Sequence, residues 1–131
     1  MSNLPRLFSR PVRTIHCVGV GGMGLGPLAI YLAGAGYEVS GEDEALACGM
    51  RAQLARAGVA VKPLPESCDL LVHTSAAGPA HPVLQVAARR GVPLVRRGTL
   101  LAEATRGRKL VAVCGSHGKT TTTAMLITVL R

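Results

Sequence analysis

A glycine-rich segment set between an apolar run and an amphipathic run constrains this chain most. Residues 14–20 read TIHCVGV, a short run of apolar and β-branched residues that predicts a buried strand. Glycines follow at once in GVGGMGLG, residues 19–26. Apolar residues then recur at helical spacing from Leu25, which predicts a helix that ends at Gly34. A strand that turns through glycines into a helix is a βα unit of a parallel sheet.

The same alternation continues along the chain. Further strands are predicted at 37–40, 59–61, 69–74, 92–95 and 110–114, the last one buried. Further helices are predicted at 46–57, at 82–90, at 100–105 with Thr99 as the cap, and from 119 onward. The pattern predicts an α/β fold with a Rossmann-like, doubly wound parallel sheet flanked by helices. Residues 1–13 contain Pro5 and Pro11 without periodicity and predict a flexible lead.

Composition and charge narrow the classes of function. Lys and Arg outnumber Asp and Glu by 15 to 7, which favours an anionic partner such as a phosphorylated small molecule. The basic residues are scattered and aromatic residues make up only 2%, which argues against nucleic-acid binding. Residues 14–37 carry no formal charge, but their glycines and Pro27 argue against a membrane helix or signal peptide. We therefore expect a cytoplasmic protein without membrane insertion.

The four cysteines predict reduced thiols. They form no C-x-x-C pair, which argues against a disulfide scaffold or a zinc site. Cys17 and Cys114 lie in apolar runs and are expected to be buried. His16 falls within a predicted strand and is interpreted as a core or sheet-edge residue, and His73 and His81 have no ligand-like spacing.

The first candidate motif is Gly19-x-Gly21-x-x-Gly24, which follows a strand and opens a helix. Glycines in this setting let the backbone approach a pyrophosphate, and the helix N-terminus supplies free N–H groups. Glu42 and Asp43 follow the next strand, where an acid can hold a ribose hydroxyl. The hypothesis is that this motif binds a ligand that carries a diphosphate. The alternative is a glycine turn that serves only helix packing.

The second candidate motif is GSHGKT at 115–120, between the last predicted strand and the last helix. In a P-loop, backbone N–H groups surround the phosphates, the lysine (here Lys119) neutralises the β- and γ-phosphates, and a hydroxyl (here Thr120) reaches Mg²⁺. The general pattern asks for glycine where Val113 stands, but the GKT core followed by three more threonines is specific. The alternative is a simple turn, which would place a cation unfavourably at a helix start.

Two smaller features lie after other predicted strands. Thr74, Ser75 and Ala76 end the strand at 69–74, and Arg97 follows the strand at 92–95. Ligands of open α/β sheets bind at the carboxyl ends of strands, so these residues are candidates for contact with phosphate or sugar. An ordinary turn and a surface arginine are equally good interpretations.

Together these segments resemble the Mur ligase family. The matching stretches are IHCVGVGGMGLGPLA (15–29), GYEVSGED (36–43), DLLVHTSAA (69–77), GVPLVRRGTLLAE (91–103) and VAVCGSHGKTTTTAM (111–125). The histidine in GSHGKTTTT resembles the branch that adds L-alanine to UDP-N-acetylmuramate, and the murein-peptide recycling branch shares it. In this family ATP phosphorylates the muramoyl carboxylate to an acyl phosphate, which the amine then attacks.

The resemblance implies a division of the chain and a set of site residues. Residues 14–105 would form the UDP-sugar domain, and 106–131 a hinge and the truncated start of the ATPase domain, inactive as a ligase alone. UDP-sugar binding falls to Gly19, Gly21, Gly22, Met23, Gly24, Leu25, Asp43, Thr74, Ser75, Ala76 and Arg97. ATP binding falls to Gly115, Ser116, His117, Gly118, Lys119, Thr120 and Thr121, with Lys119 and Thr120 catalytic and Thr120 on Mg²⁺.

Three positions depart from the family pattern. Leu25 stands where methionine is usual, and Glu42 replaces the serine of SGSD. The segment KPLPESC (62–68) is short and lacks the Gly-His that usually precedes the fourth strand. Two other readings remain open: an NAD-binding oxidoreductase domain, which has no use for the second motif, and a non-catalytic nucleotide-sensing module.

Overall fold

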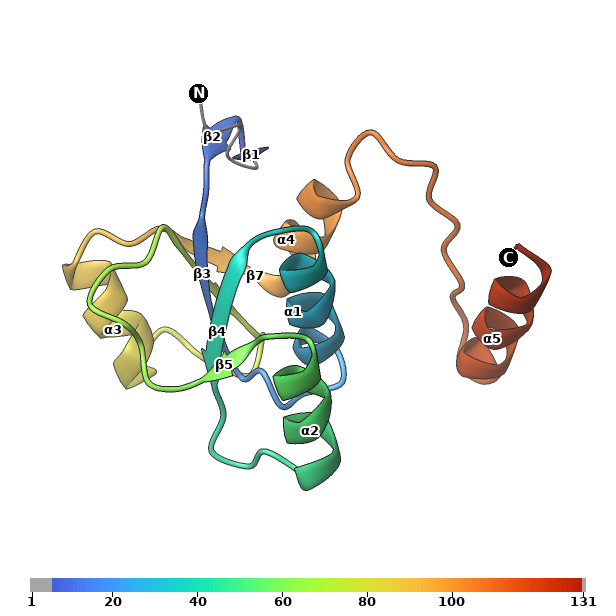
Figure 1. The fold of residues 1–131 in the computed structure, drawn as a ribbon, viewed down its shortest axis with the longest axis horizontal. Coiled ribbons are helices and arrows are strands. Elements are labelled where there is room, and N and C mark those ends of the chain that lie inside the picture. The colour runs from blue at the N-terminus through green and yellow to red at the C-terminus, as the bar shows by residue number, and fades with distance from the viewer. Residues whose placement is uncertain (1–5, 131) are drawn as a thin grey trace.

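A parallel five-stranded sheet forms the centre of the molecule (Figure 1). The computed structural model describes residues 6–130. The strand order is β5-β4-β3-β6-β7. The strands are β3 (Thr14–Val18), β4 (Glu38–Glu42), β5 (Ala60–Val61), β6 (Leu70–His73) and β7 (Leu94–Arg96). The chain builds outward from β3 on one side and then returns to its other side, so the switch point of the sheet lies between β3 and β6.

Helices cover both faces of the sheet, which confirms the predicted fold class. The helices are α1 (Leu25–Gly34), α2 (Cys48–Arg56), α3 (Pro82–Arg89), α4 (Arg97–Ala104) and α5 (Lys119–Val129). Helices α1, α2 and α4 lie on one face and α3 on the other (Figure 1). The larger core fills the first face, and a smaller core around Leu71 and Leu84 fills the second.

Local sequence explains where these helices begin and end. Helix α1 buries Leu28 and Leu32 at i and i+4 against the sheet. Helix α3 has Pro82 at its first position, where the missing N–H costs no hydrogen bond. Gly91 follows the same helix with a φ of 72°, a left-handed conformation that glycine adopts without strain.

The amino-terminal residues differ from the expected flexible lead. Strands β1 (Arg6–Leu7) and β2 (Arg10–Pro11) pair as an antiparallel hairpin. Its two-residue turn places Phe8 and Ser9 at φ values of 52° and 62°. Two successive positive φ values are typical of the tight turns whose twist matches that of a hairpin. The part of the prediction that concerns residues 1–5 lies outside the described residues.

Tertiary contacts account for this hairpin. Leu7 and Val12 are buried in the larger core, at 4% and 1% exposure. The backbone N–H of Phe8 donates to Glu103 Oε1 at 2.8 Å, which ties the turn to α4. A flexible lead was therefore the wrong prediction for residues 6–13. The sequence alone does not show that a carboxylate 95 residues away meets the turn.

The carboxyl-terminal segment also differs from expectation. Residues 110–114 form no strand, and Leu110 and Val111 are 67% and 66% exposed. A buried strand needs a partner strand, and within residues 6–130 none pairs with this segment. Helix α5 forms as predicted, but it has no buried residue and lies apart from the sheet (Figure 1).

Two smaller predictions are corrected by the same structure. Cys114 is exposed rather than buried, because the segment around it does not join the sheet. Helix α4 starts at Arg97, so Thr99 lies in its first turn and does not cap it. Cys17 is buried and His16 lies fully buried in the central strand, as predicted. Cys48 and Cys114 are the two exposed cysteines.

Candidate functional site

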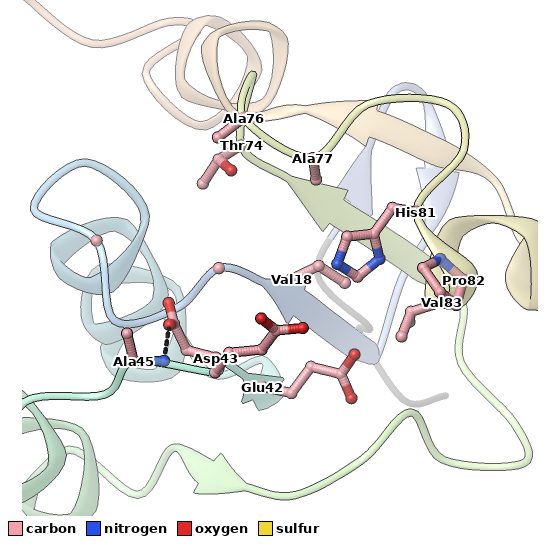
Figure 2. Close-up of a pocket in the computed structure, with 13 residues that line it drawn as sticks. Val18, Glu42, Asp43, Ala45, Thr74, Ala76, Ala77, His81, Pro82 and Val83 are labelled. Carbon is pink, nitrogen blue, oxygen red and sulfur yellow. Dashed lines mark hydrogen bonds between the residues drawn. The ribbon is translucent and has the colours of Figure 1, made fainter.

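The main cavity opens at the carboxyl ends of β3, β4 and β6, at the switch point of the sheet (Figure 2). Its volume is about 780 Å³. It is lined by Val18, Gly19, Gly22, Glu42, Asp43, Glu44, Ala45, Thr74, Ala76, Ala77, His81, Pro82 and Val83. Three strands and the start of α3 thus contribute to one hollow, because parallel strands end at the same edge.

Asp43 holds the glycine loop in place. Its Oδ2 accepts a hydrogen bond from the N–H of Gly21 at 2.8 Å, and its Oδ1 accepts one from Ala45 at 2.9 Å (Figure 2 draws the second). A Cβ added at Gly21 would meet Asp43 Oδ2 at 2.9 Å, so glycine is needed for this approach. Both carboxylate oxygens are therefore committed to the backbone of the loops at the mouth of the cavity.

The rest of the loop leaves a row of donors at the start of α1. The N–H groups of Gly19 and Val20 both donate to the carbonyl of Glu42, at 2.9 and 3.3 Å. The N–H groups of Met23, Gly24 and Leu25 have no acceptor within the described part of the chain and are free to donate to a ligand. Unpaired N–H groups and the positive end of the helix dipole together favour an anion at this point.

Arg97 brings a full positive charge to the same place. A Cβ built on Gly24 would lie 3.1 Å from the Cδ and Cζ atoms of Arg97, so the guanidinium group lies against the glycine loop. Arg97 forms no ion pair or side-chain hydrogen bond with residues 6–130. A cation at a helix N-terminus is unfavourable unless an anion lies between them. This arrangement suits a phosphate or diphosphate group.

The structure brings most of the predicted UDP-sugar residues together. Gly19, Gly22, Asp43, Thr74 and Ala76 line the cavity. The other residues of the glycine loop, with Arg97, adjoin it at the start of α1.

Ser75 is the exception. It lines a second cavity of about 420 Å³ between α3 and β7, together with His73 and Arg96. Strand β6 ends at His73, and the chain then turns, with the N–H of Ala77 donating to the carbonyl of Thr74 at 3.2 Å. Within this turn Thr74 lines the main cavity and Ser75 lines the second one.

Sequence reasoning missed the wall that α3 contributes. His81, Pro82 and Val83 line the cavity, as do Val18 and the residues after Asp43. A signal was available, because the loop after β6 leaves the same edge of the sheet as the glycine loop. Extending that rule from residues 74–76 to the start of the next helix would have included them.

The GSHGKT loop leads directly into α5. Gly118 caps α5 in the left-handed conformation, with φ 77°. The N–H groups of Lys119, Thr120 and Thr121 have no acceptor in the described structure, and Lys119 Nζ donates to the carbonyl of Gly115 at 2.6 Å. Nitrogen donors, a lysine and the Thr120 hydroxyl are a donor set that fits a nucleotide triphosphate with Mg²⁺.

The fold and the cavity together define an α/β domain with its candidate site at the carboxyl edge of a parallel sheet. A family model described as "Mur ligase family, catalytic domain" matches residues 14–109. The chain belongs to the Mur ligase family.

Individual relatives add detail. The chain is 38% identical over 123 residues to a UDP-N-acetylmuramate–L-alanine ligase of Solidesulfovibrio magneticus, covering 90% of this chain and 27% of the relative. The chain thus spans about a quarter of the length of the curated relatives that it matches.

Solved structures of two branches share the fold. One is the UDP-N-acetylmuramate-alanine ligase of Thermotoga maritima, with a TM-score of 0.80, 30% identity, and coverage of 89% of this chain and 29% of that chain. Another is the UDP-N-acetylmuramate:L-alanyl-gamma-D-glutamyl-meso-diaminopimelate ligase of Neisseria meningitides, with a TM-score of 0.82, 31% identity, and coverage of 91% and 39%. Among residues 6–130 no helix is long and apolar enough to cross a membrane.

Proposed function

We propose that residues 14–105 bind the UDP part of UDP-N-acetylmuramate, as a substrate domain of an ATP-dependent amide ligase. The observation that carries this proposal is the meeting of Arg97 with the free donors at the start of α1. Both positive groups lie beside the main cavity, and the described protein supplies no anion between them. A diphosphate there would form an ion pair with the Arg97 guanidinium and accept hydrogen bonds from the free N–H groups. The cavity has room for the nucleoside.

The choice of sugar nucleotide follows from the relatives. The printed names of the alanine ligase and of the tripeptide ligase both contain UDP-N-acetylmuramate. The two branches thus share this substrate and differ in what they join to it. L-Alanine is the favoured second substrate, because the curated relatives at 38–41% identity are alanine ligases.

In the whole protein, residues 106–131 would serve as the hinge and the start of the ATPase domain. ATP would supply the phosphoryl group that activates the muramoyl carboxylate. Lys119 would neutralise charge on its phosphates, and the Thr120 hydroxyl would bind Mg²⁺. The amine of L-alanine would then attack the acyl phosphate. A cytoplasmic location agrees with this use of ATP and of a nucleotide sugar.

The first test is a calorimetric titration of the chain with UDP-N-acetylmuramate, with NADH in a parallel cell. We expect saturable binding of the UDP-sugar alone. An Arg97→Gln variant should bind roughly ten-fold more weakly, since a hydrogen bond to a charged group is lost. Arg89→Gln removes the same charge from an exposed position on α3 and should bind as the wild type does. Binding of NADH alone would refute the proposal and favour the oxidoreductase reading.

A second variant tests the division of the chain. Lys119→Ala should leave UDP-sugar affinity unchanged, because α5 buries no residue and lies apart from the sheet (Figure 1). A large loss of UDP-sugar affinity in this variant would show that the two phosphate loops act together and would move the proposed boundary.

The tripeptide branch is a second candidate, favoured by its structural match at a TM-score of 0.82. Both candidates predict the same UDP-sugar binding by this chain. Release of phosphate by the full-length protein, measured with L-alanine or with L-alanyl-gamma-D-glutamyl-meso-diaminopimelate, separates them.

A further inference from the structure

Two acidic side chains at the end of β4 differ in their hydrogen bonds. Both carboxylate oxygens of Asp43 accept hydrogen bonds, one from the N–H of Gly21 and one from the N–H of Ala45. The carboxylate of Glu42 accepts no hydrogen bond from any residue in the range 6–130, although it lines the cavity and is only 25% exposed. A half-buried carboxylate without a donor is costly, unless a ligand supplies that donor.

A buried histidine lies directly behind Glu42. His16 is fully buried in the central strand, and its Nδ1 lies 2.9 Å from Ser40 Oγ. Its Nε2 has no hydrogen-bond partner in the described structure and lies 3.8 Å from Glu42 Oε2, beyond hydrogen-bond range. Burial first, and then the charge of Lys62, lower the pKa of His16 to about 4. The imidazole of His16 is therefore neutral at pH 7 and does not form an ion pair with the Glu42 carboxylate.

The opposite wall of the cavity carries a second unpartnered polar atom. His81 lies at the start of α3, and its Nδ1 is buried with no partner in the part of the chain described. His81 and Glu42 line the same hollow, and Val18 and Val83 add apolar side chains near His81 (Figure 2). Thr74 and the exposed Glu44 also line this cavity. A hollow with apolar walls and a few hydrogen-bonding groups suits a flat ring that carries hydrogen-bonding groups of its own.

We propose that Glu42, and not Asp43, recognises the nucleoside of the bound UDP-sugar by accepting a hydrogen bond from it. The donor is either the ring N–H of uracil or a ribose hydroxyl, and His81 contributes the facing wall. Asp43 acts as a positioning residue that fixes the glycine loop. This inference rests on the proposed function, because it names the residue that selects the ligand of that same site.

The test compares uridine diphosphate with three analogues, each lacking one donor: N3-methyl, 2′-deoxy and 3′-deoxy uridine diphosphate. We expect the wild type to bind at least one analogue roughly ten-fold more weakly, and Glu42→Ala to bind it as well as the parent compound. Glu42→Gln keeps an acceptor oxygen and should retain part of the preference. Asp43→Asn should weaken the binding of uridine diphosphate and of all three analogues by the same factor, so that the preference for uridine diphosphate stays. Glu66→Ala removes the same charge outside the cavity and should change neither the affinity for uridine diphosphate nor the preference over the analogues.

The results separate this inference from the proposed function. If UDP-N-acetylmuramate binds but Glu42→Ala and Glu42→Gln keep the full preference, the assignment of Glu42 is refuted and the proposed function stands. If Asp43→Asn or Glu44→Ala abolishes the preference instead, the recognising acid is another residue. If the wild type binds neither UDP-N-acetylmuramate nor uridine diphosphate, both proposals fail.

Discussion

Removing the carboxylate of Asp43 tests the view that this side chain is structural. Asp43→Ala deletes two hydrogen bonds from backbone N–H groups, at 2.8 and 2.9 Å. A hydrogen bond to a charged group contributes about 1.5–3 kcal/mol, and partial exposure lowers this to about 1 kcal/mol for each. The expected loss is about 2 kcal/mol of unfolding free energy. For a domain of this size, that corresponds to a decrease in Tm of roughly 8–16 °C.

The measurement is thermal unfolding followed by circular dichroism, with urea unfolding as a second probe. Asp43→Asn keeps one acceptor oxygen and should lie between the wild type and Asp43→Ala. Glu44→Ala is the matched control, because it removes a neighbouring exposed carboxylate that makes no hydrogen bond in the described structure, and it should change stability by less than about 0.5 kcal/mol. A Tm for Asp43→Ala within about 2 °C of the wild type would show that the Asp43 carboxylate does not stabilise the glycine loop.

Three further predictions follow from buried groups. Stability should fall by up to about 1.4 kcal/mol per pH unit from pH 6.5 to about 4, because unfolded but not folded His16 binds a proton there; urea titrations should show no such slope for His16→Gln. A thiol reagent should modify the two exposed cysteines quickly and Cys17 only after unfolding, because burial raises its pKa to about 12; fast loss of all thiols would contradict this. Gly41→Ala should cost about 1–3 kcal/mol in urea unfolding, since its Cβ would lie 2.7 Å from the Cys17 carbonyl. Gly34→Ala, with open space around its Cβ, should instead stabilise α1 by about 0.5–1 kcal/mol, and equal effects of the two substitutions would count against the packing.

Local patterns predicted the sheet domain well. Period and composition placed each strand of the sheet and each of its helices within a few residues, because burial on both faces leaves a clear signal in Val, Leu and Ile. Glycine, proline and the rule for carboxyl ends also indicated the correct edge of the sheet for the site. The same signals misled at 110–114, where an apolar run has no strand to pair with among the described residues.

Side-chain partnerships were beyond the reach of the sequence. From the sequence alone, Glu42 and Asp43 are two adjacent acids, and either could contact a ligand. Only the structure shows that Asp43 is used by the backbone of Gly21 and Ala45, while Glu42 faces the cavity without a donor. In the same way, the sequence alone groups Ser75 with Thr74, but the structure places the two residues in different cavities.

Patterns along the chain are enough to predict the class of fold, the family and the order of strands and helices between residues 14 and 105. Which residues meet depends on tertiary packing. It joined Phe8 to Glu103, laid Arg97 against Gly24 and placed His16 behind Glu42. Each of these contacts joins residues far apart in the chain, so its geometry depends on how the helices pack on the sheet. Local propensity carries no information on such distances, and for this reason the details of the site follow only from the folded molecule.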